Sequence, residues 1–204
     1  MVLMGSGMAD SLIALHNHLA GAYSRRFSTS GRPRAALPAP AIESAPLNEL
    51  DRSRMAVLLA AWSVLVSRIA DQERLLIGVH SKGRMLPVRM AVAGGPTSNT
   101  LIEQCRRELD EAERTSGRGF AVLRFQFTFG PTASPSAPFQ LHMHTSINEG
   151  RLSLRCDYNP SHFTEGAATV ILEHYRALLD AMAADPDRPV NCLIIDQAPP
   201  GPSH

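Results

Sequence analysis

Four segments of the chain repeat apolar residues every three to four positions, which is the spacing of a helix that buries one side. The last of them carries Val170, Tyr175 and Leu178, and it ends at Asp185-Pro186, because proline disfavours helical backbone at the residue before it. The sequence therefore predicts helices over Ser11–Tyr23, Leu47–Ala70, Thr97–Thr115 and Thr164–Ala184.

Between these segments lie shorter runs that are apolar or that alternate apolar and polar residues, as strands do. Over residues 121–129, Leu123, Phe125, Phe127 and Phe129 share one face, and we expect this face to point into the core. Two further runs are joined by residues 148–150, Asn-Glu-Gly, a sequence that suits a hairpin because Asn and Gly tolerate positive φ. The predicted strands are Leu75–Val79, Leu86–Met90, Ala121–Phe129, Phe139–Ile147 and Arg151–Tyr158.

The order of these elements mixes helices and strands without strict alternation. It predicts an α+β fold, with a mixed sheet and helices packed mainly on one face. We expect a single lobe over residues 47–197, preceded by an N-terminal helix and a Pro/Ser/Gly-rich crossover over residues 8–46. The composition of residues 28–46 fits either a flexible linker or an ordered strap. Residues 1–7 read as a tag remnant before a native start at Met8, and residues 198–204 as a flexible tail.

Composition excludes several classes of function. The chain has 204 residues, 44% of them hydrophobic, which suits one soluble domain. Its formal net charge of +1 argues against a polyanion-binding surface, so no nucleic-acid partner is predicted. No apolar run reaches the length of a membrane span, so no membrane association is predicted. The three cysteines sit at no metal-ligand spacing and cannot all pair, which favours a reduced, cytoplasmic protein.

Six short motifs follow one another in an order typical of one protein family. Together they resemble the C-terminal lobe of the condensation domains of nonribosomal peptide synthetases, members of the chloramphenicol-acetyltransferase-like superfamily. The resemblance implies a single lobe of that fold. The motifs are the helix that starts Leu58-Leu59-Ala60-Ala61-Trp62, the strand Leu75–Val79, the turn Gly83-Arg84, the strand Leu86-Pro87-Val88-Arg89, the passage Asp157-Tyr158-Asn159 to Phe163, and the closing segment Asp185–Val190.

The family's catalytic signature is missing from this chain. Condensation domains carry a His-His-x-x-x-Asp-Gly motif in their N-terminal lobe, whose second His assists attack of an amine on a thioester. No two adjacent histidines occur here. The segments that the family carries between Arg84 and Met85, and before Arg124, are also missing. The resemblance therefore implies a truncated protein that is not a competent condensation enzyme on its own.

The remaining polar motifs match family positions with structural or interlobe roles. Asp157, Tyr158 and Asn159 are expected to hold the turn from strand to helix. The matched residues are Arg84, Pro87, Arg89, Asp157, Tyr158 and Asn159.

His142 and His144 are the candidates for catalysis, because a spacing of two puts both imidazoles on one face of a strand. The competing interpretation is a pair of histidines on a solvent-facing or half-covered sheet face. Two imidazoles do not make a structural zinc site, so no metal and no cofactor are predicted. His80 and Ser81 suggest a base and a nucleophile, yet neighbouring residues of a strand point to opposite faces.

Two functions follow as hypotheses. The first is a non-catalytic, condensation-like protein of nonribosomal peptide or hybrid polyketide biosynthesis. It would bind a synthetase module, a carrier protein with a phosphopantetheine arm, or a second copy of itself, because a lobe without its partner lobe exposes apolar surface. The alternative is a repurposed enzyme that performs acyl transfer, cyclisation or isomerisation on a carrier-bound intermediate.

Overall fold

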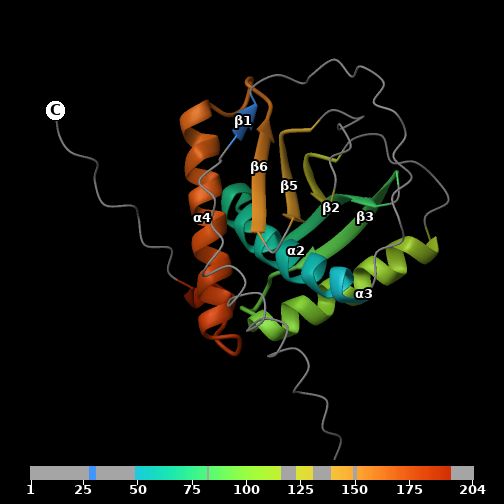
Figure 1. Ribbon diagram of the computed structural model, residues 1–204. Helices are drawn as coiled ribbons and strands as arrows, with labels where there is room; N and C mark the ends of the chain where they lie inside the picture. Colours follow the sequence, from blue (N-terminus) through green and yellow to red (C-terminus); the bar gives the residue numbers. More distant parts are fainter. Residues whose placement is uncertain are drawn as a thin grey trace, which may run out of the picture.

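The computed structural model describes residues 28–30, 49–81, 83–115, 123–130, 139–148 and 151–193. These form a mixed sheet with long helices packed against it (Figure 1). The predicted helix over residues 11–23, most of the crossover and the C-terminal tail lie outside the described residues, so those boundaries stay predictions.

The described strands form one six-stranded sheet in the order β1-β6-β5-β4-β2-β3. The pairs β2–β3 and β5–β6 are antiparallel, whereas β1–β6, β2–β4 and β4–β5 are parallel. This mixture confirms the predicted α+β class. The strands are β1 (Ser28–Ser30), β2 (Arg74–Ser81), β3 (Arg84–Ala91), β4 (Phe125–Phe129), β5 (Leu141–Asn148) and β6 (Arg151–Tyr158).

The helices pack on one face of this sheet. Helix α2 (Glu49–Ala70) lies between α3 (Ser98–Thr115) and α4 (Glu165–Ala184) and reaches β2 and β4, while α3 covers β3 and α4 covers β6 (Figure 1). Thr164 begins α4, because its hydroxyl accepts a hydrogen bond from the N–H of Ala167. A short 3-10 turn, η1 (Val190–Cys192), closes the described chain, and the Arg68 guanidinium of α2 donates to its Val190 carbonyl at 2.8 Å.

Helix α2 is buried more completely than its sequence pattern predicts. Every residue from Met55 to Val66 is buried, rather than one face. A helix that is apolar all round belongs in a core. The expectation that no segment reaches the length of a membrane span is corrected here, because residues 51–70 are long and apolar enough by composition. In this fold, however, 67% of the most apolar 18-residue stretch of that segment is enclosed by protein.

The core around strand β4 differs in one detail from the expected one, namely the place of Leu123. Phe125 and Phe127 do face the helices and are buried. Leu123 precedes the strand instead of belonging to it, and a Cβ placed on Gly78 would meet its Cδ1 at 3.0 Å. Glycine on β2 therefore lets Leu123 pack closely on the sheet, apart from the cluster that the helices cover.

Candidate functional site

Two rows of side chains cross the sheet on the face turned away from the helices. Strand pairing sets the rows, because residues directly opposite on paired strands share a face. One row is Gly78, Gln126, His142 and Asp157, and the next is His80, Thr128, His144 and Arg155. We refer to the polar members as the histidine network, namely His80, Gln126, Thr128, His142, His144, Arg155 and Asp157.

Two hydrogen bonds of the histidine network run diagonally between the two rows. His80 Nε2 lies 3.1 Å from Gln126 Oε1, and Thr128 Oγ1 lies 2.8 Å from His142 Nε2. The rings of His80 and His142 stack at 5.1 Å between centroids, and those of His142 and His144 approach to 3.8 Å. The ring of His142 therefore contacts the imidazoles of both His80 and His144.

A carboxylate completes the network at β6. His144 Nε2 and Arg155 Nη2 each lie 2.9 Å from the same oxygen, Asp157 Oδ2. Arg155 Nη2 also lies 3.2 Å from His144 Nε2. Because an ionised carboxylate only accepts, the shorter contact to Asp157 favours the tautomer of His144 that carries its proton on Nε2. Arg155 donates to that oxygen as well. This arrangement leaves Nδ1 of His144 as the unprotonated nitrogen of a neutral ring.

Burial sets the charges of these groups. It lowers the pKa of His142, and the neighbouring His144, His80 and Arg155 lower it further. Burial also lowers the pKa of His144 and of His80, against opposing hydrogen bonds from Asp157 and Gln126 respectively. Burial acts to raise the pKa of Asp157, but the hydrogen bond from His144 and the charge of Arg155 outweigh it and the pKa is lowered. At neutral pH the network holds neutral imidazoles beside one ion pair.

The histidine network has one feature of a general base, but the nitrogen atoms that would accept a proton are enclosed. An imidazole held by a carboxylate, with its other nitrogen unprotonated, is the arrangement of a His–Asp dyad. However, Nδ1 of both His142 and His144 is buried and has no hydrogen-bond partner among the described residues. In the described part of the chain no group of three His, Cys, Asp or Glu side chains has the geometry to hold a metal.

Comparison with solved structures identifies the fold. The starter condensation domain of rhizomide synthetase RzmA, in a single-substitution mutant form, superposes with a TM-score of 0.60 at 15% identity, covering 94% of this chain and 55% of that one. The X-domain from teicoplanin biosynthesis gives 0.58 at 15%, covering 95% and 58%. The first condensation domain of the CDA synthetase gives 0.58 at 15%, covering 91% and 46%.

This chain has the fold of one condensation-domain lobe. It spans about half the length of the solved structures that it matches. No family model and no curated protein matches the sequence. The resemblance in the order of the six motifs is thus matched by the three-dimensional fold, at a sequence identity of 15%.

The structure corrects the expected setting of the two candidate histidines of this condensation-like lobe. His142 and His144 do share one face of β5, but they are 0% and 5% exposed rather than solvent-facing or half-covered. Phe139 contributes to this cover, since its ring meets that of His142 edge-on at 5.5 Å. The interpretation of an accessible pair is wrong in this respect.

The three residues of the Asp157-Tyr158-Asn159 passage lie in three different environments. Asn159 lies in the expected turn, where its side-chain oxygen accepts the N–H of Ser161 and its carbonyl accepts that of Phe163. Tyr158 is buried in the helix-side core. The Asp157 side chain differs from expectation, because it faces the histidine network instead of holding the turn.

The matched residues of β3 lie at an edge of the described sheet. Arg84 and Arg89 are exposed and Pro87 is partly buried. Proline suits an edge strand, since it has no N–H to donate to a neighbour. Their interlobe role stays a prediction.

His80 and Ser81 point to opposite faces, as expected. His80 joins the histidine network, whereas the Ser81 hydroxyl donates to Glu113 on α3 at 3.4 Å. Sequence reasoning missed the part played by His80, Gln126, Thr128 and Arg155. Alternation within each strand places them on a polar face, but only the strand order and register bring them together.

Replacing the carboxylate of the network is expected to destabilise the lobe. Asp157→Asn removes the charged acceptor shared by His144 and Arg155, and hydrogen bonds to charged groups contribute about 1.5 to 3 kcal/mol. Because the Arg155 side chain is 35% exposed, we expect the lower half of that range. Urea unfolding measures the change.

Glu111→Gln provides the matched control for Asp157→Asn. Glu111 pairs with Arg114 at the same 2.9 Å distance, but both side chains are more than half exposed. This change is expected to cost less than about 1 kcal/mol. Equal losses in the two variants would show that the buried carboxylate has no special part in stability.

Proposed function

We propose that this condensation-like lobe acts through protein–protein contacts in nonribosomal peptide or hybrid polyketide biosynthesis, and not as a condensation enzyme on its own. The observation that carries the proposal is the burial of the histidine network. The Nδ1 atoms of His142 and His144 are enclosed, so no substrate reaches them in this conformation.

A protein partner is the expected ligand. One solved structure of similar fold is the complex of the X-domain and OxyB from teicoplanin biosynthesis, with a TM-score of 0.57 at 16% identity, covering 93% of this chain and 56% of that one. That complex supports an interaction role for a domain of this fold. For this chain the proposed partners are a synthetase module or a carrier protein, and the proposed compartment is the cytoplasm, in keeping with three free thiols.

Titration against the carrier proteins and modules encoded beside this chain tests the proposal. Calorimetry with each carrier in its apo, holo and aminoacyl-loaded states is expected to give saturable binding to at least one of them. A carrier protein of fatty-acid synthesis serves as the control that should not bind. Absence of binding to every cognate partner in every state would overturn the proposal.

A second copy of the chain is the alternative binding partner. The family has two lobes of similar topology, so two copies related by a two-fold axis would imitate a complete domain. Light scattering across a concentration series distinguishes a dimer from a monomer that binds other proteins.

The alternative enzyme function depends on the His144–Asp157 dyad. Acyl transfer, cyclisation or isomerisation on a carrier-bound intermediate would require the cover over His142 and His144 to open. A His142→Ala/His144→Ala variant that retains all turnover would exclude these residues. Loss of turnover with an unchanged fold would favour the enzyme.

A further inference from the structure

The arginines of the described surface fall into two groups. Those on the helices mostly have carboxylate partners, as in Arg52 with Glu113 at 2.8 Å and Arg114 with Glu111 at 2.9 Å. Arg74, Arg89 and Arg124 are exposed and form no ion pair within the described part of the chain, which is also true of Arg107 and Arg188. We call Arg74, Arg89 and Arg124 the arginine rim.

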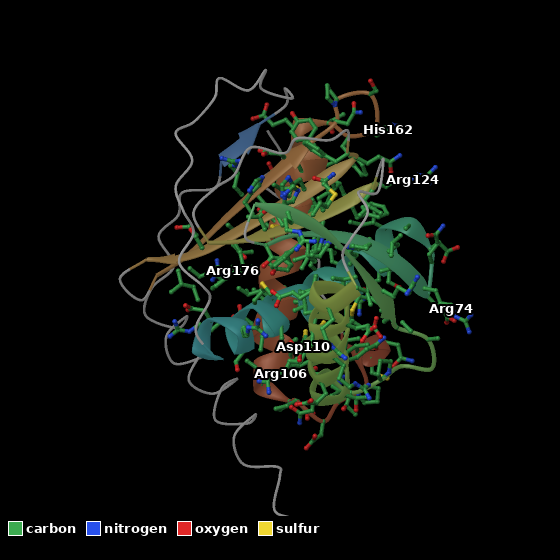
Figure 2. All side chains as sticks on the ribbon, turned by 90° about the vertical axis from the view of Figure 1, so that its right-hand side faces the viewer. Arg74, Arg106, Asp110, Arg124, His162 and Arg176 are labelled. Carbon is green, nitrogen blue, oxygen red and sulfur yellow. The ribbon has the colours of Figure 1, made fainter. Side chains whose placement is uncertain are left out.

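Strand register brings the arginine rim to one face of the sheet. Leu76 of β2 is directly opposite Arg89 of β3. On its other side Ile77 pairs with Phe125, so Arg124, one residue earlier, lies at the level of Leu76. Arg74 shares this face because it is two residues from Leu76 along the strand. Figure 2 shows Arg74 and Arg124 directed outward on the same side of the molecule.

An apolar side chain lies at the centre of the arginine rim. Leu76 is 40% exposed, and with Val170 it forms the set of large apolar side chains that are exposed in the described part of the chain. Glu73 precedes β2 and is exposed, but no ion pair joins it to Arg74 within the described part of the chain. The surface therefore combines one exposed apolar side chain with three guanidinium groups that have no carboxylate partner among the described residues.

We propose that the arginine rim and Leu76 form the docking surface for a carrier protein that presents carboxylates around an apolar side chain. This inference rests on the proposed function and names the surface through which it would operate. Arginine is favoured in protein interfaces because its planar guanidinium binds carboxylates in two-point contacts. Three positive charges on one face repel each other. The carboxylates of an acidic partner would reduce that repulsion and would themselves be attracted to the arginines.

Charge reversal at the arginine rim tests this surface. The variant is Arg89→Glu/Arg124→Glu, and the probe is whichever holo carrier protein binds the wild-type chain. The matched control is Arg107→Glu/Arg188→Glu, which reverses two other exposed arginines that form no ion pair in the described part of the chain. Both variants change the net charge equally. Circular dichroism and thermal unfolding confirm that each one folds.

We expect the rim variant to weaken binding at least about 10-fold and the control less than about 3-fold. The wild-type affinity should fall between about 50 mM and about 300 mM salt, and the rim variant should lose most of this salt dependence. Leu76→Ser, which keeps all charges, should weaken binding without changing the salt dependence. Equal effects of the rim and control variants would overturn the surface and leave the proposed function intact. No binding by the wild-type chain would instead overturn the proposed function and this surface with it.

Discussion

Lowering the pH from about 7 to about 5 is expected to destabilise this protein by at least about 2 kcal/mol. Burial lowers the pKa of His142, His144 and His80 in the folded chain, whereas an unfolded histidine titrates near pH 6.5. Below that value the unfolded chain binds more protons than the folded one, so the free energy of unfolding falls with pH. Each imidazole that stays neutral contributes about 2 kcal/mol to this loss.

The carboxylate of the network does not contribute in that range. The pKa of Asp157 is lowered in the folded chain, so its stabilising effect is present above the unfolded value near 3.9. That stability is lost only as the pH falls toward the lower folded value. A loss between pH 7 and pH 5 therefore reports on the histidines.

His142→Gln isolates the contribution of one of these imidazoles. An amide side chain can keep a hydrogen bond to Thr128 but does not titrate, so the variant should lose about 2 kcal/mol less than wild type over the same pH interval. His162→Gln is the control, because His162 is exposed. Urea unfolding at several pH values measures each profile. If the His142→Gln and wild-type profiles run parallel, the buried imidazoles are not the cause.

The fold could be predicted from the sequence because its signals are local. The β6 strand, Arg151–Tyr158, was predicted with the bounds that the structure has, since it alternates clearly and follows a hairpin turn. Helix α4 was predicted to within one residue at its start, where Thr164 caps it. The three-residue strand β1 lies inside a segment dense in Pro, Ser and Gly, and its pairing with β6 has no signal in its own residues.

The histidine network could be predicted only in part, because it depends on strands that are distant in the sequence. The spacing of His142 and His144 predicts one shared face, and that holds. Whether such a face meets water depends on what covers it, which alternation does not determine. His80 reaches the same cluster because β4 lies between β2 and β5 in the sheet, and this order is a property of the topology. Strand patterns alone therefore identified the pair and missed the third ring.

Trp62→Ala is expected to be the most destabilising single substitution in the helical layer, at about 3 to 5 kcal/mol. Trp62 is 0% exposed in the middle of α2 and meets the ring of Tyr175 on α4 edge-on, with centroids 6.1 Å apart. Removing the indole leaves a cavity where α2 and α4 pack together and also removes this aromatic contact. The loss should lower the urea midpoint in unfolding followed by circular dichroism.

Trp62→Phe separates the loss of volume from the loss of the indole N–H. The Nε1 group of Trp62 has no acceptor among the described residues, so phenylalanine keeps most of the apolar volume and removes a buried, unpaired donor. We expect this variant to cost less than about 1.5 kcal/mol. Circular dichroism is needed for both variants because Trp62 is the single tryptophan of the chain and its fluorescence disappears with either change. If Trp62→Phe were as unstable as Trp62→Ala, the indole N–H would contribute through a hydrogen bond that α2 and α4 do not supply. The explanation of this effect by packing of the helix pair would then be wrong.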